Sequence, residues 1–221
     1  MRNRPLAILF DMDGVVTHTM PFHYRCWKRI FEEEGLSLRR VDIYAREGQK
    51  GINSIREIFA LKGVRVSTRR ATELLKKKEI LFKRIARTQF VPGARTFIRD
   101  CKRRGLLTAL VTGTSRHEMH RVLPEAILAC FDVVVTGSDV REGKPAPEPY
   151  QKALSLLKVP VSRALVIENA PFGIRSARAA GIRCVALKTS LPESYLSEAD
   201  LIVRDYQELR RALYGQTFPR K

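Results

Sequence analysis

The chain has 221 residues, of which 44% are hydrophobic and 29% charged, and 41 Lys and Arg against 23 Asp and Glu give a net charge of +18. This length suits one sizeable core, or a core with a small inserted domain, and the hydrophobic content is ordinary for a soluble globular protein. No apolar run approaches the roughly 20 residues of a membrane span. Four scattered cysteines without a CxxC pair indicate neither a zinc site nor a disulfide framework, so we expect reduced and mostly buried thiols and a cytoplasmic location.

An apolar run at the N-terminus, residues 5–10, predicts a first strand that ends at Asp11 and Asp13. From about residue 19 to 91 no convincing strand follows, and apolar residues recur there at helical spacing. We therefore predict a helical insertion after the first strand, with FVPGA at 90–94 as the return linker. The apolar positions are Phe22, Cys26, Trp27, Ile30 and Phe31, then Leu74, Leu75, Leu81, Phe82 and Ile85.

Beyond the insertion, short apolar runs alternate with helical patterns. Most of these runs are continuous, as is typical of parallel strands covered on both faces. The alternation predicts an α/β fold with a parallel, Rossmann-like sheet. The runs are Leu106–Val111, Asp132–Val135, Ala164–Ile167, Cys184–Leu187 and Leu201–Val203. The helical patterns are Thr96–Arg104, His117–Leu123, Pro149–Leu157 and Pro171 to Gly181. Ser115 and Glu118 form a predicted capping box at the start of the second of these. Residues 215–221 (GQTFPRK) are expected to fray.

The basic excess is uneven along the chain. Residues 18–92 hold 18 Lys and Arg against 8 Asp and Glu, a balance of +10, and the remaining 23 and 15 give +8. Both a solvated helix surface and a face towards an acidic ligand would account for this, and both readings stay open. A nucleic-acid-binding module is a remote alternative, because the basic residues are dispersed over several helices and no nucleic-acid motif is present.

Polar residues follow four of the predicted strands. Because the C-terminal ends of parallel strands lie along one edge of a sheet, where ligands bind, we expect these residues to converge. They are Asp11 and Asp13 after the first strand, Thr112 and Gly113 after the second, Lys144 in the loop after the third, and Glu168 and Asn169 after the fourth.

The acidic members of this set suit a divalent cation. Asp11, Glu168 and Asn169 supply hard oxygen ligands of the kind that Mg²⁺ prefers, and such an ion commonly bridges to phosphate. One aspartate of the Asp11–Asp13 pair could be a nucleophile that forms an aspartyl-phosphate, and the other a general acid and then base.

The remaining members suit a phosphate group. Thr112 offers a hydroxyl donor, and Gly113 lets backbone N–H groups approach an anion at the start of a helix. Lys144 supplies a positive charge that can hold both a phosphate and an ionised aspartate. Such a site stabilises the charge of a transferring phosphoryl group.

Four motifs occur in order: DMDGVVT, LVTGTS, GKPAPEPY and VIENAPFGIRSARAAG. With these motifs and the segment MPFHYRCWKRIFEEEGL, the chain resembles the haloacid dehalogenase superfamily over nearly its whole length. The closest likeness is to the branch with a helical cap, which includes β-phosphoglucomutase. The resemblance implies a Rossmann-like core, at residues 1–18 and 92–221, and a mobile helical cap, at residues 19–91.

The resemblance also implies roles for individual residues. Asp11 would be the nucleophile and a Mg²⁺ ligand, and Asp13 the acid/base, with its backbone carbonyl on the metal. The other residues carried over are Thr112 and Lys144 for the phosphoryl group, and Glu168 and Asn169 for the metal site.

Three positions depart from the family pattern. His18 and Asn169 stand where relatives commonly have Asp; the amide oxygen of Asn169 can still bind Mg²⁺, but the site loses one negative charge. The cap loop EGQKGINSIRE resembles the substrate loop of the mutase. The mutase's phosphate-gripping arginine, however, aligns with Ser54, and Arg56 is out of register, which argues against bisphosphate chemistry.

The candidate substrate contacts in the cap are His23, Lys50 and Asn53. His23 lies on or near the apolar face of the first cap helix, so packing and substrate contact are equally open, whereas Trp27 is expected in the cap core. Lys50 and Asn53 lie in a glycine-flanked loop that could reach the site.

We therefore expect a Mg²⁺-dependent phosphatase of a small anionic phosphorylated metabolite, acting through an aspartyl-phosphate. The close alternative is a sugar phosphomutase, in which the phosphoryl group passes to a sugar hydroxyl instead of water. The intact acid, lysine and threonine positions argue against a catalytically inactive relative. We expect a monomer or weak dimer with no membrane partner.

Overall fold

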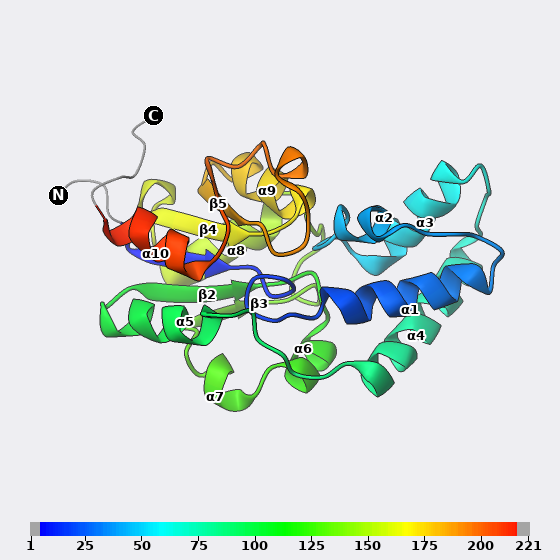
Figure 1. The fold of residues 1–221 in the computed structure, drawn as a ribbon, viewed down its shortest axis with the longest axis horizontal. Helices are drawn as coiled ribbons and strands as arrows, with labels where there is room; N and C mark the ends of the chain where they lie inside the picture. Colours follow the sequence, from blue (N-terminus) through cyan, green and yellow to red (C-terminus); the bar gives the residue numbers. More distant parts are fainter. Residues whose placement is uncertain (1–4, 216–221) are drawn as a thin grey trace.

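A parallel six-stranded sheet lies at the centre of the structure, a computed structural model that describes residues 5–215 (Figure 1). Its strands pair in the order β3-β2-β1-β4-β5-β6, and every neighbouring pair is parallel. The predicted fold class and strand positions are confirmed, with ends that differ by two residues or fewer. The strands are β1 (Ala7–Phe10), β2 (Leu107–Val111), β3 (Val133–Val135), β4 (Ala164–Glu168), β5 (Arg183–Leu187) and β6 (Leu201–Val203).

The central strand β1 shows why these runs are continuously apolar. Leu9 belongs to the core on one face of the sheet and Phe10 to the core on the other, because successive side chains of a strand alternate. Both are fully buried. Phe10 is paired with Leu110 of β2 and with Ile167 of β4. The residues that follow these three strands therefore emerge together at one edge of the sheet.

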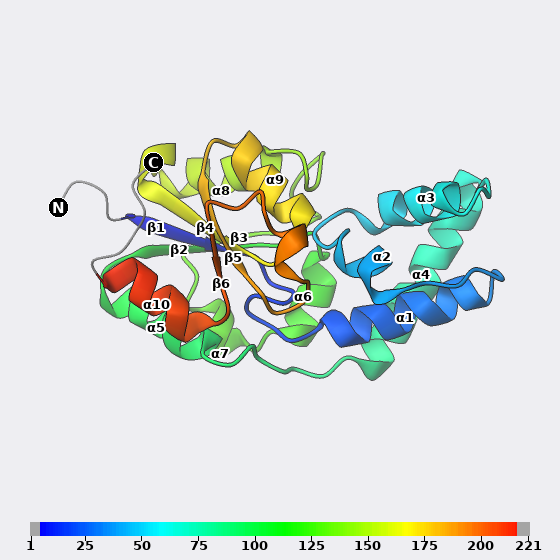
Figure 2. The same ribbon diagram turned by 45° about the horizontal axis from the view of Figure 1, so that its top comes forward.

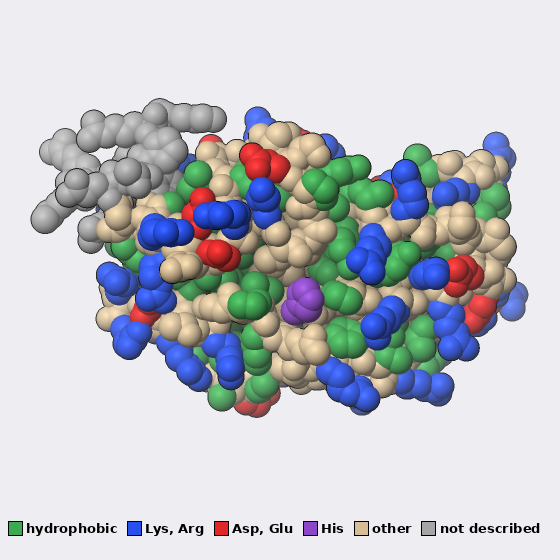
Figure 3. Space-filling view, in the orientation of Figure 1, with side chains coloured by type: hydrophobic (Ala, Val, Ile, Leu, Met, Phe, Trp, Pro, Cys, Tyr) green, Lys and Arg blue, Asp and Glu red, His purple; other side chains and the backbone are tan. Residues whose placement is uncertain are grey.

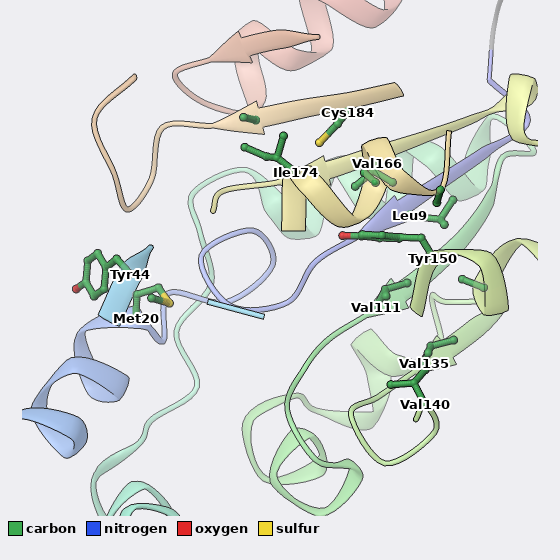
Figure 4. Packing of buried hydrophobic residues seen from close by; sticks show 14 of the residues in the cluster. Leu9, Met20, Tyr44, Val111, Val135, Val140, Tyr150, Val166, Ile174 and Cys184 are labelled. Atoms are coloured by element: carbon green, nitrogen blue, oxygen red, sulfur yellow. The ribbon is translucent and has the colours of Figure 1, made fainter. Parts of the chain in front are cut away.

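Helices cover both faces of the sheet. Figure 4 shows Tyr150 of α8 (Glu148–Leu157) beside Leu9 of β1, and Ile174 of α9 (Pro171–Ala179) close to the same core. The opposite face packs against α5 (Ala94–Arg103), α6 (Arg116–Val122), α7 (Glu125–Leu128) and α10 (Tyr206–Tyr214). Two short 3-10 helices, Val161–Arg163 and Glu193–Tyr195, lie in connections.

Two helix starts differ in detail from the predictions. Helix α5 begins at Ala94, ahead of residue 96, because Gly93 adopts a φ of 86° that turns the return linker directly into the helix. Ser115 caps α6 by accepting a hydrogen bond from the Glu118 N–H at 3.3 Å. The Glu118 carboxylate is directed instead towards Lys78, 3.9 Å away. Only the serine half of the predicted capping box is thus formed.

Of the five helices between β1 and β2, the first four lie beside the sheet layers, and we call them the cap helices (Figures 1 and 2). Their apolar core includes the buried side chains of Phe31, Phe59 and Leu74. Residues 19–89 contain no strand, which confirms the predicted helical insertion. The exact domain limits stay a prediction. The cap helices are α1 (Met20–Glu32), α2 (Arg40–Tyr44), α3 (Gly51–Leu61) and α4 (Thr68–Ile85).

Two chain segments connect the cap helices to the sheet, and they run side by side. His18 N–H donates to the Gln89 carbonyl at 2.8 Å, and Val91 N–H donates to the Val16 carbonyl at 3.1 Å. The two connections therefore form one short hydrogen-bonded neck. Among residues 5–215, no helix has the length and apolar character that a membrane span requires.

The cysteines form no disulfide: Cys26, Cys101 and Cys184 are buried and Cys130 is half-buried. This agrees with the reduced, mostly buried thiols expected from their spacing. The predicted fraying of residues 215–221 lies, beyond Gly215, outside the described residues.

Candidate active site

Lys144 lies between two carboxylates at the C-terminal edge of the sheet. Its Nζ donates to Asp11 Oδ1 at 2.7 Å, to Glu168 Oε1 at 2.6 Å and to the Val111 carbonyl at 3.1 Å. The lysine side chain is 1% exposed. Asp11 follows β1, Val111 ends β2 and Glu168 ends β4, so the convergence expected from a parallel sheet is observed.

The charges of this cluster are strongly coupled. Burial and, after it, the Glu168 charge outweigh the opposing charge of Lys144 and together raise the pKa of Asp11 to about 8. Burial also disfavours the charged form of Lys144, but the Asp11 and Glu168 carboxylates outweigh burial and raise the pKa of the lysine. Two carboxylates share one ammonium, so one further positive charge at Asp11 would favour its ionised form.

Asp13 is held by a separate set of donors. The Thr19 hydroxyl donates to Oδ1, the Thr114 hydroxyl donates to Oδ2 at 3.1 Å, and His23 Nε2 lies 3.3 Å from Oδ1. Burial disfavours the charged carboxylate, but these contacts, those of His23 first, outweigh it and lower the pKa of Asp13. The His23 ring also stacks on Phe82, with centroids 4.2 Å apart. His23 therefore both packs in the cap and contacts the predicted acid/base.

Two buried oxygens of the predicted metal site have no hydrogen-bond partner within residues 5–215: Asp11 Oδ2 and Asn169 Oδ1. Leaving such atoms unsatisfied is costly, and a cation bound at Asn169 Oδ1 beside the Asp11 carboxylate would offset this cost. The Asn169 amide donates to Ser190 Oγ at 2.9 Å and lies against the loop after Asp13, since a Cβ on Gly14 would fall 2.1 Å from Asn169 Nδ2. The donors therefore fit Mg²⁺.

The predicted metal site does not depend on a cluster of acids. Among the described residues, no group of three or more His, Cys, Asp or Glu side chains is placed to hold a metal. The candidate ligands are instead one carboxylate, one amide oxygen and, as the resemblance implies, the backbone carbonyl of Asp13.

Glu168 is occupied by other partners. Its Oε1 accepts hydrogen bonds from Lys144 and from the Tyr150 hydroxyl at 2.7 Å, and its Oε2 accepts one from the Asn169 N–H at 3.0 Å. These contacts place Glu168 as the support of Lys144, and its predicted role as a metal ligand stays a prediction. Sequence reasoning quoted Tyr150 within a motif but gave it no role, because no spacing rule links it to Glu168.

The predicted phosphate-binding residues follow β2. Thr112 is buried, and its hydroxyl accepts a hydrogen bond from the Thr114 N–H at 3.0 Å. A Cβ on Gly113 would fall 2.4 Å from the Gly48 carbonyl oxygen. The cap loop thus lies directly on the loop of Thr112 and Gly113. Thr114, which contacts Asp13, was missed by sequence reasoning.

The two other cap candidates differ in their surroundings: Lys50 is in the lining of the cavity described next but is engaged by backbone carbonyls, and Asn53 is not in that lining. Lys50 Nζ donates to the carbonyls of Val140 and Arg141, at 3.0 and 2.5 Å, and so ties the cap loop to the loop that precedes Lys144. Asn53 is exposed on α3 and does not line the cavity described next.

A cavity of about 270 Å³ lies between the cap helices and the ends of β2 and β3. Trp27, expected in the cap core, is buried but also lines this cavity. Glu47 from the loop after α2 lines it too. Burial, with the charges of Asp13 and Asp11, raises the pKa of Glu47 well above its usual range. Other lining residues include His23, Lys78, Gly113, Thr114 and Glu118.

Comparison with known proteins gives matches over most of the chain. A family model described as "haloacid dehalogenase-like hydrolase" matches residues 5–181. The chain is 30% identical over 203 residues to "Validoxylamine A 7'-phosphate phosphatase" of Streptomyces hygroscopicus subsp. limoneus, covering 91% of this chain and 94% of that protein. A solved structure named "Putative beta-phosphoglucomutase from Bacteroides vulgatus" superposes with a TM-score of 0.86 at 31% identity, covering 96% of this chain and 88% of that one.

One further relative is much longer than this chain. "Protein SUPPRESSOR OF QUENCHING 1, chloroplastic" of Arabidopsis thaliana is 30% identical over 201 residues, which are 87% of this chain but 19% of that protein. The matched region is therefore one part of a larger protein there.

Proposed function

Because the chain belongs to the haloacid dehalogenase-like hydrolases, the family that its four motifs resemble, we propose that it is a Mg²⁺-dependent phosphatase of a small phosphorylated metabolite, such as a sugar phosphate, that acts through an aspartyl-phosphate on Asp11. The observation that carries the proposal is the buried contact of Lys144 with both Asp11 and Glu168. Lys144 holds Asp11 Oδ1 and leaves Oδ2 without a partner within residues 5–215. One carboxylate oxygen is thus fixed while the other is free to react.

In the first step, Asp11 Oδ2 forms a bond to phosphorus and the bond from phosphorus to the substrate's alcohol oxygen breaks. Asp13 gives that oxygen a proton, and the alcohol leaves. When a substrate binds, its negative phosphate raises the pKa of the nearby Asp13 carboxyl. Asp13 is therefore protonated before it donates to the leaving oxygen.

In the second step, water forms a bond to phosphorus, the bond to Asp11 Oδ2 breaks, and Asp13 takes the proton of the water. Inorganic phosphate leaves, and Asp11 is regenerated. The hydrogen bonds from Thr19, Thr114 and His23 stabilise the charged form of Asp13 that this step requires.

Phosphate oxygens would bind between Lys144, the Thr112 hydroxyl and the backbone at Gly113. Asp11, Asn169 and the Asp13 carbonyl would hold Mg²⁺, which when bound supplies positive charge beside the transferring phosphoryl group. The cap loop lying on Gly113 excludes water from this side.

The main alternative, a sugar phosphomutase, is motivated by the relative with that name. It is less well supported, because Ser54 stands where the mutase has its phosphate-gripping arginine, and Arg46, the arginine among the lining residues of the cavity, is engaged by Glu57. Ser54 donates to Gln49 at 2.9 Å, and Arg56 is exposed and donates to Thr68 at 3.0 Å. Incubation with β-glucose 1-phosphate separates the two functions: a phosphatase gives free phosphate, and a mutase gives glucose 6-phosphate.

A nucleic-acid-binding function stays the remote alternative. Figure 3 shows Lys and Arg side chains scattered over both the sheet layers and the cap helices on this face, instead of gathered along one groove. Several of them are paired with acids, as Arg70 is with Glu34 and Glu73. The cytoplasmic location and the monomer or weak dimer remain predictions.

The test is the Asp11→Asn variant, assayed with Mg²⁺ against a panel of sugar, glycolate and nucleotide monophosphates. We expect a loss of at least about a thousandfold in kcat/KM for each substrate, because the nucleophile is removed. Asp42→Asn, in a cap carboxylate paired with Arg39 outside the site, should keep wild-type rates. Substantial turnover by Asp11→Asn would end the proposal.

A further inference from the structure

The cavity beneath the cap helices is joined to the candidate reaction centre by two residues. His23 and Thr114 both contact Asp13 and both line the cavity of about 270 Å³. If the chain is a phosphatase as proposed, the alcohol protonated by Asp13 lies in this cavity. The chemistry of the lining residues then selects the alcohol.

Two cations of the lining are already engaged elsewhere. Arg46 donates to Glu57 at 3.2 Å and to the Asp42 carbonyl at 2.8 Å. Lys50 donates to two backbone carbonyls of the loop that precedes Lys144. Neither side chain is therefore available to bind an anionic group of a substrate.

The remaining charges in the lining are three carboxyl groups and one ammonium: Glu47, Glu79, Glu118 and Lys78. Glu118 is 6% exposed, and its Oε1 has no hydrogen-bond partner among residues 5–215. Lys78 is its nearest cation, at 3.9 Å, which is beyond hydrogen-bond distance, and the ammonium lies 4.7 Å above the Phe82 ring. A buried carboxylate oxygen without a donor is costly unless a ligand supplies one.

We propose that the alcohol carrying the phosphate is polyhydroxylated and either neutral or cationic, and that the cavity excludes alcohols bearing a carboxylate or a second phosphate. Glu118 accepts hydrogen bonds from hydroxyl or ammonium groups and repels a second anion in a site sheltered from water, and Glu47 adds a carboxyl group that exchanges hydrogen bonds with hydroxyl groups. Most of the basic residues among 18–92 lie outside this cavity, as the exposed side chains of Lys76 and Lys77 on the cap helices show; Arg46, Lys50 and Lys78 are in its lining. Of the two readings of that excess, the solvated surface is favoured.

Three pairs of substrates test this, each differing only by CH₂OH in place of a carboxylate. They are 2-hydroxyethyl phosphate against phosphoglycolate, glycerol 1-phosphate against 3-phosphoglycerate, and glucitol 6-phosphate against 6-phosphogluconate. We expect kcat/KM for the hydroxyl member to exceed that for the carboxylate member by at least about tenfold, because each pair isolates one added negative charge. Equal or reversed preference in the pairs that are hydrolysed would overturn the inference.

Glu118→Gln and Glu47→Gln test the residues themselves, and Glu73→Gln, in an exposed cap carboxylate paired with arginines, is the control. We expect Glu118→Gln to lower the hydroxyl-to-carboxylate ratio at least about threefold, Glu47→Gln to lower kcat/KM for the hydroxyl members at least about threefold, and the control to keep both quantities. A ratio that Glu118→Gln leaves unchanged, together with hydroxyl-member rates that Glu47→Gln leaves unchanged, would refute the role of these carboxyls. The two variants lie on different elements, so misfolding of one leaves the other decisive.

Hydrolysis of p-nitrophenyl phosphate separates this inference from the proposed function. If the wild type hydrolyses neither this compound nor any member of the pairs, the phosphatase proposal itself fails. If it hydrolyses p-nitrophenyl phosphate but no hydroxylated member, the phosphatase stands and the substrate class is wrong.

Discussion

Replacing Lys144 by methionine would remove the one ammonium that two buried carboxylates share. Methionine keeps the unbranched shape of the side chain and lacks only one heavy atom, the Nζ itself, so the effect is mainly electrostatic. Removing one partner of a buried ion pair costs about 3–5 kcal/mol, and we expect the upper end at pH 8 because Nζ contacts both Asp11, at 2.7 Å, and Glu168, at 2.6 Å. Phosphatase activity should fall to background in the same variant.

The loss of stability should depend on pH. Without the ammonium, the pKa of Asp11 rises further above its unfolded value, so at this group the folded state binds more protons than the unfolded state and the free energy of unfolding falls as pH rises. At pH 5 Asp11 is protonated in the variant, and we expect a deficit of about 1–2 kcal/mol, that of unsatisfied hydrogen bonds.

The assay is urea unfolding followed by circular dichroism at pH 5, 6.5 and 8, with EDTA present throughout. The double variant Lys144→Met, Glu168→Gln removes one of the repelling charges and should regain at least about 1 kcal/mol at pH 8. A Lys144→Met protein as stable as the wild type at pH 8, or a deficit that does not change with pH, would refute the reasoning.

Three further outcomes follow from the site and its surroundings. Burial disfavours the charged form of Asp139, but hydrogen bonds, first the one from Thr136, outweigh burial and lower its pKa to about 2. Asp139→Asn should therefore reduce the free energy of unfolding by about 1–2 kcal/mol at pH 7. Urea titrations should show this difference above about pH 4 and lose it as pH falls through about 2. Gly113→Ala should lower kcat/KM about tenfold to a hundredfold in a steady-state assay, since its Cβ would fall 2.4 Å from the Gly48 carbonyl oxygen and push the cap loop away. EDTA should abolish activity. Added Mg²⁺ should raise the Tm more at pH 8.5 than at pH 6, because Mg²⁺ needs ionised Asp11, and the pKa of Asp11, raised first by burial, is about 8 in the metal-free site. A Tm rise independent of pH would contradict this assignment.

Most of the fold could be predicted because its determinants are local. Each strand is a short apolar run between turn residues, and both faces of β1 are buried, so periodicity and composition were sufficient. The convergence of Asp11, Lys144 and Glu168 followed from one topological rule, that parallel strands end at the same edge. Helix ends were less predictable, as the half-formed capping box at Ser115 shows.

The cap contacts could not be predicted in the same way. Lys50 and Asn53 are candidates because they lie in a glycine-flanked loop that could reach the site. In the structure Lys50 lines the cavity but donates to backbone carbonyls 90 and 91 residues away, and Asn53 is exposed. Glu47, three residues before Lys50, also lines the cavity, and no sequence signal pointed to it. Within a loop, no period specifies which side chain faces inward.

The sequence by itself determined the sheet, the helical insertion and the set of acids, lysine and threonine at the strand ends, because these depend on residue types at short spacings. Only the tertiary structure decided that Tyr150 supports Glu168, that Thr114 and His23 hold Asp13, and that the buried Glu118 carboxylate lines a cavity in a chain of net charge +18. The physical reason is that partners of a buried polar group are chosen by proximity in space. Packing brings together side chains that are far apart along the chain, while most of the excess positive charge stays in water.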